Sequence, residues 1–351
     1  MSSDYGYINA RIRGLRSKLL DRKDIESFWN VKAIDDVIQK LKGTDYGTQL
    51  GQLSSKYEGL NLIEHSMSEN LSFNLRKLLD ISSEEPNRLI SILLKKWDST
   101  NLKSILRGKH SGASSQEVAE ALVPAGELGR TLLFKLNETD SVKHLIDTLT
   151  TWHLDIARPL NNAFKDYGIS SDLSILEKVI NEFYFTQTVE TILGKDINSR
   201  MTKEVFQSEI DLLNIVNALK LVSEKVRPEE GKYTFLNGGK KDFESYFVRL
   251  LGSNSIEELC SRLPESPYGA SARDGLMTYA QSGSLSDIER SLEKGLINMY
   301  VKMYYEYPLT IAVPIGYIWM KCNEVINLRI VIRAKAFDIP ETIAKEQMHF
   351  V

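Results

Sequence analysis

Cysteine is scarce in this sequence, and long apolar runs are missing. Two cysteines, Cys260 and Cys322, in 351 residues are too few for the disulfide framework of a small secreted domain. The most apolar window, 309–320, is shorter than the roughly 20 residues of a membrane-spanning helix. The start, MSSDYGYINARIRG, has no apolar segment behind its charges, unlike a secretory signal. These absences predict a reducing, cytoplasmic compartment and no segment that crosses a bilayer.

No charge of one sign dominates. The 44 Lys and Arg residues against 47 Asp and Glu residues give a net charge of −3, which argues against a nucleic-acid partner. The chain is 42% hydrophobic and 26% charged, as is ordinary for a globular protein long enough to form more than one domain.

Residue patterns of a catalytic, cofactor or metal site are also missing. The five histidines do not have metal-ligand spacing, and neither cysteine has an activating signature beside it. The stretch LNGGKKDF at 236–243 resembles a phosphate loop only superficially. It lacks the first glycine and has Lys241 where serine or threonine would bind magnesium. We therefore predict a turn there, and a protein that is not an enzyme and needs no cofactor or metal.

Proline is absent from residues 1–85 and 160–227, which leaves room for long helices. The segments AIDDVIQKL, SVKHLIDTL and SIEELCSRL each carry apolar residues at the i, i+3, i+4 and i+7 positions of an amphipathic helix. Alternating runs typical of strands are nearly absent, and KYTFL at 232–236 is too short to carry a sheet. The sequence predicts an all-α fold.

One polar pattern occurs three times at a spacing of 113 residues. An acid precedes an asparagine by three residues, apolar positions follow, and a basic residue closes the set. The members are Asp98, Asn101 and Arg107; Asp211, Asn214 and Lys220; and Glu324, Asn327 and Arg333. The sequence TDYG at 44–47 also has a counterpart in SPYG at 266–269. We interpret these matches as three copies of one helical unit, 1–115, 116–228 and 229–351, with turns at both borders.

The acid and the asparagine share one helix face. If three such helices line a common axis, these groups meet partners from a neighbouring copy and form a polar layer that fixes how the copies dock. The alternative is that Asp98, Ser99 and Thr100 only cap or kink their helix locally.

Two other surface patterns leave alternatives open. The first helix carries a basic series, Arg11, Arg13, Arg16, Lys18, Arg22 and Lys23. Such a series contacts phosphates, acidic lipid or a partner subunit, or it is a solvated face paired with acids. The aromatic clusters EFYF at 182–185 and MYYEYP at 303–308 are interface anchors or core, and their helical spacing favours core.

Three of these stretches together resemble a known family. The segments are YINARIRGLRSKLL, DSTNLKSILRGKHSG with LVPAGELG after it, and NEVINLRIVIRAKAFDIPETI. The chain looks like the C subunit of archaeal and bacterial V/A-type ATPases and ATP synthases, a relative of the d subunit of eukaryotic V-ATPases. The resemblance covers the whole chain; the second copy departs from it, with Val222 where the others have Lys109 and Lys335.

The resemblance implies a funnel-shaped body of three pseudo-threefold-related helical repeats, peripheral at the cytoplasmic face of the membrane. It implies a non-catalytic adaptor, one copy per complex, that seats central-stalk subunits D and F on the proteolipid rotor ring and carries torque during ATP-coupled proton or sodium transport. A soluble helical-repeat scaffold of another cytoplasmic complex is the alternative. Its weakness is that copies of this length exceed the roughly 34 to 47 residues of helical solenoid repeats.

Overall fold

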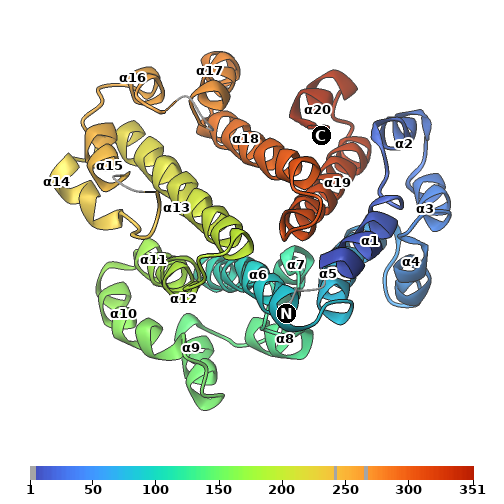
Figure 1. The fold of residues 1–351 in the computed structure, drawn as a ribbon, viewed down its shortest axis with the longest axis horizontal. Coiled ribbons are helices and arrows are strands. Elements are labelled where there is room, and N and C mark those ends of the chain that lie inside the picture. Colours follow the sequence, from blue (N-terminus) through green and yellow to red (C-terminus); the bar gives the residue numbers. More distant parts are fainter. Residues whose placement is uncertain (1–4, 241–242, 265–267) are drawn as a thin grey trace. The chain divides into compact units, whose positions relative to one another are not determined.

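The computed structural model describes residues 5–240, 243–264 and 268–351. Throughout this part the regular structure is helical and no strand occurs, so the prediction of an all-α fold is confirmed there (Figure 1). The three amphipathic segments form α3 (Ile34–Lys42), α9 (Val142–Thr151) and α16 (Ile256–Ser261). Among the described helices, none combines the length and the apolar character needed to cross a membrane.

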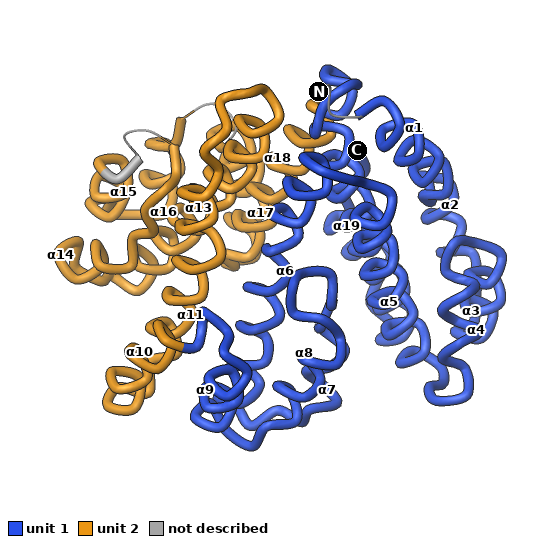
Figure 2. The backbone as a smooth tube through the Cα atoms, turned by 60° about the horizontal axis from the view of Figure 1, so that its bottom comes forward, with its two compact units in different colours: residues 1–157, 304–351 blue, residues 158–303 orange. Residues whose placement is uncertain are grey.

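The chain folds into two compact units (Figure 2). Unit 1 contains residues 1–157 and 304–351, and therefore both ends of the sequence. Within it, α19 packs against α1 and α5. Besides α3 and α9, its helices are α1 (Tyr5–Arg16), α2 (Arg22–Glu26), η1 (Ser27–Asn30), α4 (Gly47–Leu53), α5 (Gly59–Asp80), α6 (Glu84–Ser111), α7 (Ser115–Ala121), α8 (Arg130–Asn137), α19 (Ala312–Ala336) and α20 (Glu341–Gln347).

Unit 2 contains residues 158–303 and is built around one long helix, α13 (Ile197–Ser223), which packs against η2, α15 and α16. Its other helices are α10 (Ala157–Ser170), α11 (Ser174–Asn181), the π-helix η2 (Glu182–Thr186), α12 (Gln187–Thr191), α14 (Pro228–Gly231), η3 (Lys232–Thr234), α15 (Phe243–Leu251), α17 (Ala270–Ser282) and α18 (Leu285–Glu306), which ends in unit 1. The division into three domains at 115 and 228 stays a prediction.

Local sequence chemistry sets the ends of the long helices. Helix α6 ends at Gly112, whose φ of 74° is in the left-handed region that favours glycine. Helix α13 begins after Asp196, whose carboxylate accepts hydrogen bonds from the N–H groups of Asn198 and Ser199. The predicted turn at 227–232 differs: it contains the short α14, because Pro228 occupies the first helical position, where its missing N–H costs nothing.

Helices α17 and α18 approach each other closely at Gly275. A Cβ built on Gly275 would lie 2.8 Å from the Cα of Ile288 and 3.0 Å from the Cβ of Ser291. The backbone of α18 therefore leaves no room for a side chain at this position of α17.

We expect Gly275→Ala to lower the free energy of unfolding by about 1–3 kcal/mol because the extra methyl group overpacks this contact. Gly168→Ala, in α10 of the same unit, is the matched control because nothing lies within 4 Å of its Cβ position. There alanine should add about 0.5–1 kcal/mol by favouring the helix. Urea unfolding of both variants measures the difference; equal effects would show that the approach at Gly275 is not tight.

Candidate functional site

Polar side chains are buried in the middle of the three longest helices. The repeated acid and asparagine lie on α6 (Asp98, Asn101), α13 (Asp211, Asn214) and α19 (Glu324, Asn327), and none is more than 4% exposed. A buried polar group costs free energy unless it finds a partner. The partners of these six side chains therefore define what the repeated pattern does.

Each repeated asparagine binds the backbone of the residue 22 positions later. Asn101 donates to the carbonyl oxygen of Val123 at 2.8 Å and accepts from its N–H at 2.9 Å. Asn214 makes the same two bonds to Leu236, both at 2.9 Å. Asn327 makes them to His349 at 2.6 and 3.0 Å. We call this arrangement the amide clamp; it fastens the connection after each long helix to that helix.

The repeated acids bind backbone N–H groups in the same manner. Asp98 accepts from Glu127 at 2.8 Å and Leu128 at 3.0 Å. Asp211 accepts from the N–H of Lys240 at 3.1 Å. These donors follow their acid by 29 or 30 residues.

The third acid takes its donor from the other end of the sequence. Glu324 accepts from the N–H of Leu20 at 2.6 Å. This bond ties the connection after α1 to the middle of α19. The acids therefore bind backbone donors, as the asparagines do, and the common layer that would join all three pairs stays a prediction.

Glycines let two of these acids reach their donors. A Cβ on Gly126 would lie 2.2 Å from Oδ1 of Asp98, and one on Gly239 would lie 2.1 Å from Oδ1 of Asp211. Each glycine follows its acid by 28 residues, a recurrence that a search of the sequence at this spacing would have found. Gly239 belongs to the stretch LNGGKKDF, predicted as a turn. In this stretch the backbone N–H of Lys240 donates to the carboxylate of Asp211. Lys241 lies outside the described residues.

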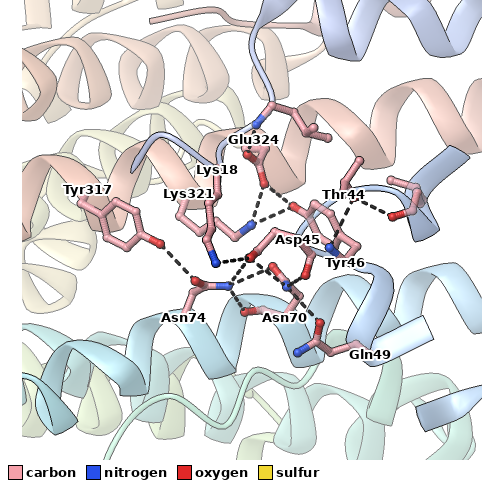
Figure 3. Close-up of polar contacts among 12 residues, drawn as sticks. Lys18, Thr44, Asp45, Tyr46, Gln49, Asn70, Asn74, Tyr317, Lys321 and Glu324 are labelled. Carbon is pink, nitrogen blue, oxygen red and sulfur yellow. Dashed lines mark hydrogen bonds and ion pairs between the residues drawn. The ribbon is translucent and has the colours of Figure 1, made fainter. Parts of the chain in front are cut away.

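Tyrosines of the TDYG and SPYG stretches meet two of the acids. The hydroxyl of Tyr46 donates to Oε1 of Glu324 in the buried interior of unit 1 (Figure 3). The hydroxyl of Tyr268 lies 3.5 Å from Oδ2 of Asp211 and 3.3 Å from the carbonyl oxygen of Ser208. Among the described residues, no tyrosine is recorded as a partner of Asp98. The second copy has WHLD at 152–155 where the other two have TDYG and SPYG.

Glu324 also takes part in a buried ion pair. Lys321 is 1% exposed, and its Nζ lies 2.6 Å from Oε1 of Glu324 and 3.2 Å from the hydroxyl of Tyr46. A buried charge pair needs additional hydrogen bonds to offset desolvation, and the bonds from Leu20 and Tyr46 supply them. Lys321 was not among the predicted site residues, although its i, i+3 spacing from Glu324 is visible in the sequence.

A second polar group lies beside this pair and surrounds Asp45 (Figure 3). Asn74 donates to Oδ2 of Asp45 at 3.0 Å and accepts from the hydroxyl of Tyr317 at 3.2 Å. Asn70 donates to the backbone carbonyl oxygen of Asp45 at 2.8 Å. Burial raises the pKa of Asp45, but the bond from Asn74 and the charge of Lys321 outweigh it and leave the pKa below its usual value.

The three closing basic residues have no common partner. Arg107 is exposed. Lys220 lies 3.5 Å from a carboxylate oxygen of Glu289. Arg333 lies 2.6 Å from Glu64, a buried carboxylate that Arg329 also approaches, at 2.8 Å.

Burial shifts two of the acids strongly. It raises the pKa of Asp98 to about 7, although the N–H groups of Leu128 and Glu127 favour the charged form. It raises the pKa of Asp211 to about 6 against the opposing hydrogen bond and charge of Lys240. Neither has a buried lysine like the one beside Glu324, which is why desolvation dominates.

The buried polar groups join segments of the chain to one another. In the described ranges, no cluster of three or more His, Cys, Asp or Glu side chains has an arrangement that holds a metal. Each repeated acid or asparagine forms hydrogen bonds with backbone groups elsewhere in this chain or with a neighbouring side chain. The arrangement suits a rigid helical protein in which long helices hold the connections between them.

Comparison with known proteins identifies the family. The family model described as "ATP synthase (C/AC39) subunit" matches residues 8–347. The chain is 31% identical to the A-type ATP synthase C subunit of Methanococcoides burtonii over 348 residues, 99% of this chain and 94% of the relative. It is 28% identical to that of Methanosarcina mazei over 350 residues (99% and 93%) and 26% identical to that of Haloferax volcanii over 342 residues (97% and 96%). The chain belongs to the ATP synthase (C/AC39) subunit family.

Loss of an amide clamp should destabilise the protein. We expect Asn327→Leu to lower the free energy of unfolding by about 1–3 kcal/mol because the N–H of His349 loses its partner, while its carbonyl oxygen keeps only the bond from Asn323. Asn214→Leu should cost more, since Leu236 is 1% exposed and water cannot replace the lost bonds as readily. Urea unfolding measures both. The exposed Asn61 provides the control, Asn61→Leu; if all three variants unfold alike, the clamps do not stabilise the fold.

The shifted pKa of Asp98 predicts a pH dependence. Its folded pKa of about 7 lies above the ordinary value of 3.8, so the folded state binds more protons between these values. Stability therefore falls as pH rises through this window. Between about pH 5 and about pH 7.5, the free energy of unfolding of the wild type should fall by about 2–3 kcal/mol more than that of Asp98→Asn.

The control for this measurement is Asp36→Asn, whose side chain is exposed. It should keep the wild-type dependence on pH. If the unfolding free energy of Asp98→Asn changes with pH as that of the wild type does, the raised pKa of Asp98 is contradicted, whatever the absolute stability of the variant.

Proposed function

We propose that this protein is the C subunit of an A-type ATP synthase and acts there as a non-catalytic adaptor. It seats the central-stalk subunits D and F on the proteolipid rotor ring and transmits torque between them during ATP-coupled proton or sodium transport. One copy serves each complex, at the cytoplasmic face of the membrane, with no nucleic-acid partner. The observation that carries this proposal is the family match over residues 8–347, supported by relatives named as the C subunit of A-type ATP synthase that align over 97–99% of this chain.

Stiffness is the physical property that such an adaptor needs. Torque is lost wherever a loaded segment yields, and densely packed helices transmit strain because their interiors leave little room to deform. The amide clamps fasten connections, which are ordinarily the most mobile parts of a fold, to the middle of α6, α13 and α19. The bonds that Glu324 accepts from Leu20 and Tyr46 do the same for the N-terminal part of unit 1.

We further propose that the chain consists of three related copies, each containing one of the long helices. The constant 22-residue offset of the clamps supports this proposal. So does the glycine found 28 residues after Asp98 and again after Asp211. In a rotor, copies of one module offer similar surfaces to a symmetric ring, while their divergence allows an asymmetric stalk to bind.

Co-isolation tests the proposed role. An affinity-tagged chain, expressed in its own organism, is purified from detergent-solubilised membranes, and its companions are identified by mass spectrometry. We expect rotor-ring, stalk and ATPase-head subunits, and we expect the isolated chain to hydrolyse no ATP. Recovery in a soluble assembly without any ring subunit would contradict the proposal and favour the helical scaffold considered from the sequence.

A further inference from the structure

Three arginines of α1, the exposed Arg11 and Arg13 and the half-buried Arg16, hydrogen-bond to neutral partners. Arg11 donates to the hydroxyl of Tyr7 at 3.1 Å, and Arg13 donates to the carbonyl oxygen of Pro308 at 3.1 Å. Arg16 donates to the hydroxyl of Tyr305 at 2.5 Å. These partners are neutral, and among the described residues no carboxylate lies within 4.0 Å of these guanidinium groups.

Some exposed basic side chains elsewhere in unit 1 are paired with carboxylates. The pairs Arg22–Glu26, Lys143–Asp147 and Lys345–Glu341 have nitrogen–oxygen distances of 2.5–2.8 Å. The whole chain has a net charge of −3. Arg11, Arg13 and Arg16 thus concentrate positive charge on α1 of a slightly acidic protein, and one carboxylate, Glu306, belongs to the neighbouring segment 305–309. A surface with such an excess of positive charge attracts an anionic partner.

Exposed aromatic and apolar side chains lie beside Arg13 and Arg16. The segment 305–309 packs on α1, because Asn9 and Arg13 both donate to the carbonyl oxygen of Pro308. It exposes Tyr305 by 56% and Leu309 by 68%. Of the cluster MYYEYP, predicted as core, Met303 and Tyr304 are indeed buried, whereas Tyr305 and Tyr307 are not. The core prediction is wrong for these two tyrosines, which are 56% and 40% exposed.

Arginine, tyrosine and an exposed leucine form the combination that suits a bilayer surface. Tyrosine rings favour the headgroup level, and arginine reaches phosphate groups while its stem covers apolar atoms. A leucine at the tip of a short segment adds apolar area without forming a spanning helix. A docking site for an acidic protein segment would share the positive charge, but it gives no reason for a solvated leucine beside it.

We propose that α1 and the segment 305–309 form a lipid-contact patch, comprising Arg11, Arg13, Arg16, Tyr305, Tyr307 and Leu309, that binds the headgroups of anionic phospholipids. The inference goes beyond the adaptor role and rests on the proposed function only in that a rotor-ring subunit works close to a membrane surface.

Flotation with vesicles tests the patch. The full chain is mixed with vesicles of phosphatidylcholine alone or of an equal mixture with phosphatidylglycerol. We expect binding to the anionic vesicles only, weakened by added salt. Because each basic residue near an anionic surface contributes about 1 kcal/mol, Arg11→Gln with Arg13→Gln should weaken binding about 30-fold. Leu309→Ser should weaken it further without changing the thermal unfolding temperature, since this side chain is exposed.

The matched control is Lys143→Gln with Lys345→Gln, which removes two exposed positive charges that are already paired. It should bind as the wild type does. Equal losses in both double variants, or no binding to anionic vesicles, would overturn the proposal. Binding to an acidic polypeptide such as polyglutamate but not to vesicles would also overturn it and favour a protein partner. Because the assay contains no ring or stalk, its failure leaves the adaptor role untouched.

Discussion

The fold depends on one interaction: a buried asparagine in the middle of a long helix that binds both backbone groups of a residue in the following connection. A connection exposes N–H and C=O groups that a helix would satisfy internally, and burying them without partners costs several kcal/mol. The carboxamide is well suited because it holds a donating NH₂ group and an accepting oxygen side by side in fixed geometry. With Asn101, Asn214 and Asn327 in place, the connections pack against α6, α13 and α19 and remain satisfied.

The acids beside these asparagines are geometrically alike but chemically different. Asp98 relies on two backbone donors, Asp211 on one donor and a distant tyrosine, and Glu324 on a buried lysine, a tyrosine and a backbone donor. A carboxylate without a buried countercharge is only partly compensated for lost hydration, which is why burial raises the pKa of the two aspartates. The acid at the equivalent position of each long helix is therefore stabilised by a different set of partners.

Much of this could be predicted because periodicity and spacing are local properties of the sequence. The helical class, the amphipathic helices and the residues of the repeated pattern were all found in this way. The partners were not, because Val123, Leu236 and His349 contribute only backbone groups, which carry no residue-type signal. Tyr46 lies 278 residues from Glu324, and no local pattern indicates such a contact. Gly126 and Gly239 were within reach, since their offset from the acid is constant. The grouping into two units depends on which helices pack together, and the spacing of residues along the sequence does not indicate this.

The discontinuity of unit 1 bears on how the chain reaches its fold during synthesis. Residues 158–303 form a compact unit of their own and leave the ribosome as one uninterrupted stretch. Unit 1 begins first but lacks α19 until residues 312–336 have emerged. Until then Leu20, Tyr46 and Glu64, which bind residues of α19, have no partners there. The unit begun earliest is thus completed last, and its early helices need protection from premature association for as long as the intervening unit takes to be translated.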